Sequence, residues 1–177
     1  MGTEPADFIL SSEDKLIMVH VKCGKAAQRP NSSAGAIYEV GSQAVKNLHT
    51  LVSQGFERYA NDTNLRNKWK VSSKQSNQVE LDSRIRLYNG KYDLNLFQQP
   101  DTLDEVFEEI NKRRKDVLVK KEVWLVIGNA FSKSHFNRQM ESISNAEDES
   151  KQAYQLIETW LNTLSSHDVD LKIFVSH

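Results

Sequence analysis

Hydrophobic and polar positions along the chain predict an alternation of strands and helices. Two apolar runs near the start, Ala6 to Leu10 and Leu16 to Lys22, have the length of strands and are separated by a short polar turn. Apolar residues at helical spacing then predict a long helix from Ala36 to about Ala60. The apolar stripe of this helix consists of Ile37, Val40, Ala44, Leu48 and Leu51.

The middle of the chain carries weaker patterns. Residues from Asn61 to Asn77 are polar and have no strong period, which predicts a loop with a broken helical piece. Asn89-Gly90 lies between two alternating runs, and such a pair is a strong signal for a β-hairpin, here from Val79 to Phe97. A candidate capping box begins a helix that we expect from Thr102 to Lys115.

The last third of the chain predicts two strands that flank two helices. The strands are Val123 to Ile127 and Leu171 to Val175, and the helices are Ser134 to Ile143 and Glu147 to Leu164. A strand, helix, strand order favours parallel pairing with a right-handed crossover. The predicted fold class is therefore α/β, with a mixed central β-sheet, helices on both faces, and the hairpin as an insertion or a sheet edge.

Composition limits the class of protein. At 177 residues the chain has the length of one domain, and we expect a single domain over residues 1–177. A net charge of -1 means that any DNA contact must come from local basic patches. The single cysteine, Cys23, indicates a reducing, cytoplasmic location and is expected to be a small buried residue. No signal peptide or membrane-spanning run is visible, so we expect no membrane partner.

The first two predicted strands carry the candidate chemistry. Strand side chains alternate between faces, so His20 and Lys22 share one face, while the odd-numbered residues take the other face and suit a buried sheet. If the strands pair as neighbours, Asp7 approaches His20 and Lys22. A carboxylate, a second ligand-type side chain and a lysine can together hold a divalent metal and act on a phosphodiester. The alternative is an ordinary strand end, with Lys22 in water and His20 satisfied by a neighbour.

This pattern resembles the PD-(D/E)xK nuclease superfamily, in which a strand aspartate is followed by a strand carrying (D/E)-x-K. Residues Ala34 to Leu48 resemble the helix that follows those strands, and His20 stands where the superfamily has Asp or Glu. The whole chain is similar to nuclease-like domains appended to helicases in prokaryotic genome-defence proteins, and the segment Phe131 to Ser134 fits the same resemblance. The resemblance implies a restriction-endonuclease-like core.

The same resemblance suggests roles for the three strand residues. Asp7 would bind Mg²⁺ or Mn²⁺, His20 would ligate the same metal or position the attacking water, and Lys22 would stabilise the charged phosphate. An imidazole ligand shifts the preference towards Mn²⁺. A complete domain of this kind usually has a helix and a strand before these strands, so we expect the chain to be a fragment of a larger protein.

Further polar residues are candidates for supporting roles. Glu39 and Gln43 lie one turn apart on the predicted helix and can point back at the sheet, where Glu39 would supply the carboxylate that is missing at His20. Lys46 can contact a phosphate, and Glu4 is a further candidate acidic ligand. The alternatives are a solvated helix face and an exposed acid near the chain end.

Basic residues outside the strands are candidate DNA contacts. Lys25 and Arg29 lie in the loop that follows Lys22, where they can track a DNA backbone. Lys133 lies in the Ser132-Lys133-Ser134 segment at a predicted helix start, which favours helix capping first and phosphate contact second.

Two functions stay open at this point. The first is metal-dependent hydrolysis of DNA phosphodiesters, with DNA as substrate and a helicase or another part of a larger complex as partner. The second is a catalytically inactive nuclease-like fold that acts as a nucleic-acid or protein interaction module. A Rossmann-like small-molecule domain is a poorer third hypothesis because the chain lacks a glycine-rich first turn.

Overall fold

The computed structural model of the chain describes residues 5–24, 31–54, 69–71, 79–81, 85 and 100–175. Two compact units make up the chain. The larger unit is formed by Pro5–Gly55 and Arg113–His177, and the smaller unit by Met1–Glu4 and Phe56–Lys112. The expectation of a single domain stays a prediction, because a compact unit is not by itself an independently folding domain.

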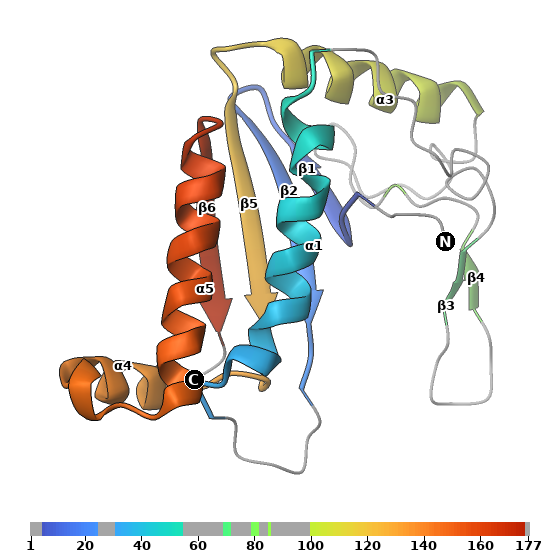
Figure 1. Ribbon diagram of the computed structural model, residues 1–177. Coiled ribbons are helices and arrows are strands. Elements are labelled where there is room, and N and C mark those ends of the chain that lie inside the picture. The colour runs from blue at the N-terminus through green and yellow to red at the C-terminus, as the bar shows by residue number, and fades with distance from the viewer. Residues whose placement is uncertain are drawn as a thin grey trace. The chain divides into compact units, whose positions relative to one another are not determined.

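The larger unit contains a four-stranded mixed sheet in the order β1-β2-β5-β6 (Figure 1). Strand β1 (Phe8–Ser11) pairs antiparallel with β2 (Lys15–Lys22), whereas β5 (Lys120–Ile127) is parallel to both β2 and β6 (Val169–Val175). The helices of this unit are α1 (Ala34–Val52), α4 (Lys133–Glu141) and α5 (Asp148–Ser165), with a short 3₁₀ turn at Ile143–Asn145. The predicted α/β class and the parallel pairing of the last two strands are confirmed.

The described part of the smaller unit consists of one strand pair and a helix. Strand β3 (Trp69–Val71) pairs antiparallel with β4 (Val79–Leu81), and α3 (Pro100–Lys115) extends into the larger unit at its last turn. The predicted start of α3, Thr102, lies two residues after the observed start at Pro100. A loop was the wrong prediction for β3, because two strand-forming residues, Trp69 and Val71, flank its central lysine. Most of the predicted hairpin, including Asn89-Gly90, lies outside the described residues.

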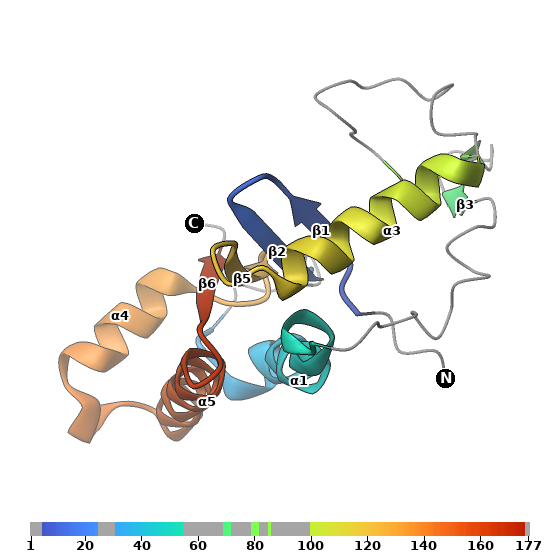
Figure 2. The same ribbon diagram turned by 90° about the horizontal axis from the view of Figure 1, so that it is seen from above.

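Both long helices of the larger unit lie on one face of the sheet. Figure 2 shows α1 and α5 side by side on the same side of the strands. The chain moves from β2 to β5 to β6 in one direction, and successive right-handed crossovers in one direction place their helices on the same face. The prediction of helices on both faces is therefore wrong for the described part of this unit.

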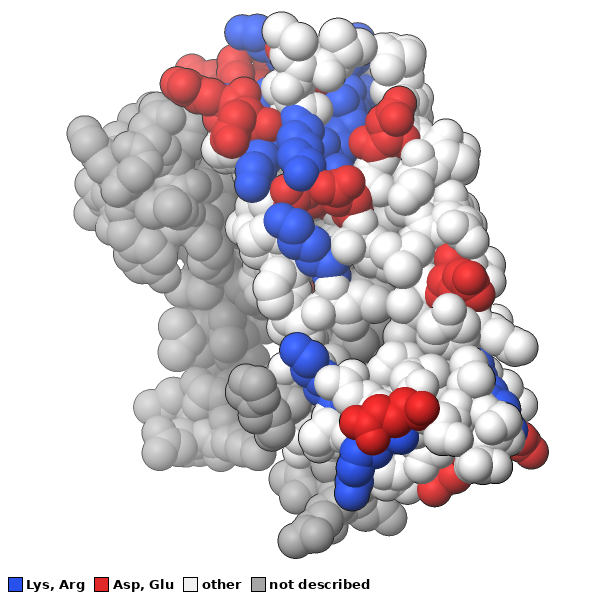
Figure 3. Space-filling view, turned by 90° about the vertical axis from the view of Figure 1, so that its left-hand side faces the viewer, with Lys and Arg blue, Asp and Glu red and all other residues white. Residues whose placement is uncertain are grey.

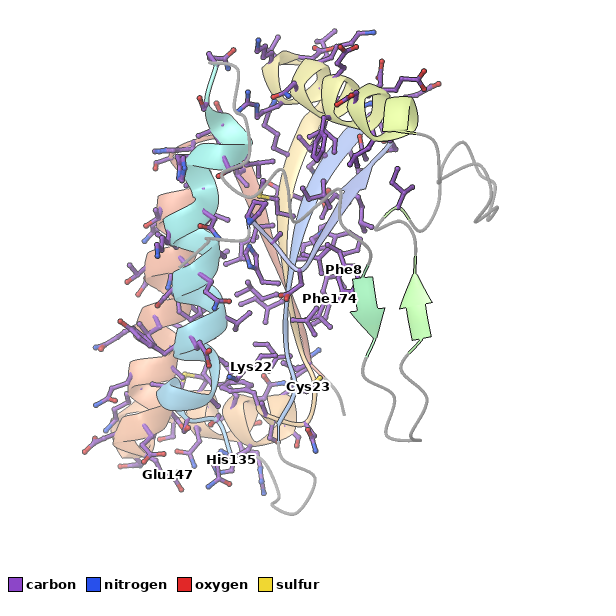
Figure 4. The ribbon with its side chains drawn as sticks, turned by 90° about the vertical axis from the view of Figure 1, so that its right-hand side faces the viewer. Phe8, Lys22, Cys23, His135, Glu147 and Phe174 are labelled. Carbon is purple, nitrogen blue, oxygen red and sulfur yellow. The ribbon has the colours of Figure 1, made fainter. Side chains whose placement is uncertain are left out.

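The helix-covered face of β2 is the more deeply buried one. Leu16, Met18 and His20 of β2 lie on it, and each is at most 2% exposed. On the opposite face, Phe8 and Phe174 are 49% and 44% exposed and point away from the helices (Figure 4). The prediction that the odd-numbered residues of β2 are buried is confirmed for Ile17 and Val19 and is wrong for Val21, which is exposed. The helices nevertheless cover the even-numbered face, because the crossovers and not the strand pattern decide this.

A buried carboxylate lies on the face away from the helices. Glu122 is fully buried and accepts hydrogen bonds from Lys172 at 2.8 Å and from the Trp124 indole at 2.7 Å. The ammonium groups of Lys15 and Lys120 lie 3.5 and 3.9 Å from its other oxygen. Burial disfavours the charge of Glu122, but the two hydrogen bonds and the charge of Lys15 outweigh this effect and lower its pKa to about 2.

The approach of α1 to α5 depends on a glycine. Gly41 lies on the buried side of α1, directly against the indole of Trp160 from α5. A Cβ atom built on Gly41 would overlap the indole ring, which is itself only 5% exposed and has little room to move. Gly35, one and a half turns earlier on α1, has open space at the same position.

We therefore expect Gly41→Ala to lower the free energy of unfolding by about 1–2 kcal/mol, because the cost of overpacking exceeds the gain in helix propensity. Gly35→Ala is the matched control and should leave the stability unchanged or raise it by up to about 1 kcal/mol, since it gains the propensity without the clash. Urea unfolding of both variants measures the difference. Equal stabilities would show that the close contact between α1 and α5 is not a constraint.

Candidate active site

Asp7 lies opposite His20 of β2 and forms hydrogen bonds with the residues on either side of it. Its backbone N–H donates to the carbonyl of Val19 at 3.0 Å, and its carboxylate accepts a hydrogen bond from the N–H of Val21 at 2.7 Å. These two bonds extend the β1–β2 ladder by one residue and place Asp7 beside His20. The expected approach of Asp7 to His20 is therefore present in the structure.

His20 is a buried imidazole with an unpaired nitrogen. The residue is 2% exposed, and its Nε2 atom has no hydrogen-bond partner among the described residues. Burial lowers the pKa of His20, and the charge of Asp7 opposes this effect without cancelling it. The imidazole is thus neutral at pH 7, which is the protonation state that a metal ligand requires.

At the end of β2, Lys22 contacts α1. Its ammonium group forms an ion pair with the carboxylate of Glu39 in α1, and both side chains are partly exposed, by 38% and 60% respectively. Because Lys22 lies on the same face as His20, the pair stands at the C-terminal end of the helix-covered face. Figure 4 shows Lys22 at this end of the sheet.

The donor atoms of this cluster are those that a divalent cation uses. Asp7 and Glu39 offer carboxylate oxygens, and His20 offers a buried nitrogen without a hydrogen-bond partner among the described residues. Among the described residues, however, no three His, Cys, Asp or Glu side chains are already close enough to form a metal site. The residue types therefore fit a divalent cation, and in the structure Glu39 is paired with Lys22 instead.

The other predicted site residues have different positions. Gln43 and Lys46 lie on the exposed side of α1, and neither side chain contacts another described polar group. Lys133 is exposed in the first turn of α4, where Ser132 caps the helix by accepting a hydrogen bond from His135 N–H, as the capping prediction required. Glu4, Lys25 and Arg29 lie outside the described residues.

The prediction of a buried Cys23 is wrong. The residue is exposed because it follows the last residue of β2, where the strand alternation no longer applies. Gly24 comes next and packs against the backbone of Ala130, which leaves no space for a side chain at that position.

A polar network holds the start of α1. The hydroxyl of Ser32, which is buried, lies 2.8 Å from Nδ1 of His135 and 2.6 Å from the hydroxyl of Ser150 in α5. Nε2 of His135 lies 3.8 Å from the carboxylate of Glu147 (Figure 4). The network joins the segment before α1 to α4 and α5. It therefore fixes where α1 begins, and with it the position of Glu39 near Lys22. Its members are far apart in sequence, which is why sequence patterns missed it.

A groove opens between the first turns of α1 and the first half of α5. Its volume is about 540 Å³, and Glu39 lines it together with the exposed Tyr38. The other lining residues are Ala34, Gly35, Gln152, Gln155, Leu156 and Thr159. Sequence analysis missed this groove, because α5 has no motif that would place it beside α1; the only signal was an aromatic residue, Tyr38, outside the apolar stripe.

Charged side chains do not form a broad basic surface on the face that Figure 3 shows. Blue and red side chains lie next to one another there. On this face, electrostatic attraction of DNA would therefore come from single basic side chains and not from a continuous patch.

Comparisons with known proteins do not assign the chain to a family. Neither the protein-family models nor the curated proteins nor the solved structures contain a match to it. Within the described residues, none of the helices combines the length and the apolar character needed to cross a membrane. The function has to be argued from the site itself.

The buried His20 predicts a pH-dependent stability. Since burial lowers its pKa below the ordinary value of 6.5, the unfolded chain binds the proton more readily than the folded chain. The free energy of unfolding should therefore be fully maintained above pH 6.5 and should decrease as the pH falls below that value towards the lower folded-state pKa. Urea unfolding across this range should show a weaker decrease for His20→Leu.

The control for this prediction is His167→Gln, which replaces an exposed histidine in the turn before β6. It should keep the wild-type pH dependence. If His20→Leu also keeps it, His20 does not contribute to the loss of stability at low pH.

Proposed function

We propose that this unit is a nuclease-like domain of the PD-(D/E)xK type that hydrolyses DNA phosphodiesters with Mg²⁺ or Mn²⁺. The observation that supports the proposal is that Asp7 lies beside the buried His20 on β2, while Lys22 at the end of the same strand pairs with Glu39 of α1. Three separate segments of the chain supply these residues, so their grouping is a property of the fold and not of one sequence stretch.

The connectivity supports a restriction-endonuclease-like core. An antiparallel strand pair carries Asp7 and Lys22, the next described helix is α1, and β5 then pairs parallel with β2. This arrangement agrees with the order that the resemblance implies, although a four-stranded α/β unit is also compatible with other folds.

Each residue has a distinct role in the proposal. The carboxylates of Asp7 and Glu39 and the free Nε2 of His20 would hold the cation, which when bound polarises the phosphate and lowers the pKa of a bound water. Glu39 thereby supplies the acid that is absent at His20. Lys22, released from its pair with Glu39, would donate to the phosphate oxygens on which negative charge develops during hydrolysis.

The wider context is proposed on the resemblance alone. DNA is the expected substrate, and a helicase or another part of a larger defence complex is the expected partner. Lys46 and Lys133 are exposed and are available for phosphate contacts on either side of the site.

A second candidate function is a nuclease-like module without catalytic activity. The observation that favours it is the ion pair of Glu39 with Lys22, which occupies the two groups that catalysis would need at the same time. In this case the unit would bind nucleic acid or protein, and the site would be structural.

Cleavage of supercoiled plasmid DNA tests the first proposal. With Mg²⁺ or Mn²⁺ present, Asp7→Asn, Lys22→Ala and Glu39→Gln should each lower the rate by on the order of 10²-fold or more, because each removes a ligand or a charge-stabilising group. The matched controls Glu141→Gln and Lys115→Ala change exposed charges elsewhere and should cleave like the wild type. Equal rates for all variants would remove the site assignment, and no cleavage by any of them would favour the second function.

A further inference from the structure

We infer that the groove between α1 and α5 receives an unpaired base of the DNA strand, which stacks on Tyr38 and is contacted by the amides of Gln152 and Gln155. The inference rests on the proposed function, since it takes DNA as the ligand. It adds a substrate class, single-stranded or locally unpaired DNA, and names residues that select it.

The groove and the candidate active site share one residue. Glu39 forms its ion pair with Lys22 and at the same time lines the groove. A strand whose phosphate lies at Lys22 therefore has the groove as the neighbouring space for one of its bases. Tyr38, the residue next to Glu39 in α1, lines the same groove.

The lining has the chemistry of a base-binding site. Tyr38 is 58% exposed and offers an aromatic face without a described hydrogen-bond partner. The side-chain amides of Gln152 and Gln155 make no hydrogen bond to another described residue, so their donors and acceptors are available for the edge of a base. Every nucleobase combines a flat π-face with such an edge, and aromatic stacking is the common way in which proteins hold single strands.

Other ligands fit the groove less well. Among its lining residues only Glu39 is charged, and it is negative, so a phosphate would be repelled and not held there. An amphipathic helix would need a continuous apolar surface, whereas polar side chains alternate with Leu156 and Ala34 along the groove. The volume of about 540 Å³ lies within the range of small-molecule sites and is sufficient for one nucleotide.

The geometry also selects the state of the DNA. In a duplex the faces of a base are stacked and its edge is paired, so neither Tyr38 nor the two glutamines can reach it. A base that enters the groove has to be single-stranded or turned out of the helix. The site should therefore prefer unpaired strands over intact duplexes.

The test measures binding without cleavage. Fluorescence anisotropy in EDTA compares a labelled eight-nucleotide dT strand with a strand of the same length that consists of abasic sites. Wild-type protein should bind the dT strand about tenfold more tightly, since stacking of one base contributes this much or more. Tyr38→Ala should lose most of this difference, and Tyr38→Phe, which keeps the aromatic face, should retain it.

The matched control is Tyr154→Ala, which removes an exposed tyrosine of α5 that does not line the groove. It should leave the difference between the two strands unchanged. The inference is overturned if wild type does not distinguish the strands, whether it binds both or neither, or if Tyr38→Ala still distinguishes them. The anisotropy test contains no metal and measures no cleavage, so its outcome is independent of the plasmid assay. A negative anisotropy result leaves a positive cleavage result valid, and a negative cleavage result leaves a positive anisotropy result valid.

Discussion

The packing of α1 on the sheet determines most of what this unit can do. The helix covers the face that carries Leu16, Met18 and His20, and so it forms the core and removes the imidazole from water. The same packing carries Glu39 to the end of β2, where it meets Lys22. The contact of Gly41 with Trp160 fixes how closely α5 lies beside α1, and the groove opens between their first turns. Core, candidate site and groove thus depend on one helix position.

Glu122 and His20 are two polar side chains buried in the sheet, and they differ in how the cost of burial is offset. Glu122 is buried with hydrogen bonds from Lys172 and Trp124, and its charge is stabilised. His20 is buried with a neutral ring and one nitrogen that has no hydrogen-bond partner among the described residues. An unpaired buried polar atom destabilises a fold by about 1–3 kcal/mol, so its retention is explained if a ligand satisfies it. Oε1 of Glu122 also lacks a hydrogen bond to a described residue, but the ammonium groups of Lys15 and Lys120 lie 3.5 and 3.9 Å from it. We therefore place the candidate metal site at His20, where no cation lies beside the unpaired nitrogen among the described residues.

Local patterns were sufficient to predict much of the larger unit. The apolar stripe of α1 is buried at all five predicted positions, although the helix begins at Ala34, two residues earlier than expected. The two short strands and their alternation also predicted that Asp7 would lie beside His20 and that His20 and Lys22 would share one face. These features depend on residues that are close in sequence, where periodicity is informative.

The features that sequence missed depend on distant pairings. Which face of β2 the helices cover follows from the direction of two crossovers, and no pattern within the strand records it. The groove beside Tyr38 and the network of Ser32 with His135 and Ser150 require α4 and α5 to be placed first. Glu122 follows two lysines at the start of β5, and the sequence does not show that Lys15 and Lys172 of the neighbouring strands also lie beside it.

The central claim is that Asp7, His20 and Glu39 form a site for a divalent cation, and calorimetric titration of the full chain with Mn²⁺ tests it most directly. The account predicts saturable binding by wild type and by the control Glu141→Gln. Binding should be at least tenfold weaker in Asp7→Asn and in Glu39→Gln, because each loses a charged oxygen ligand. Absence of binding in wild type, or equal binding in Asp7→Asn, would contradict the claim.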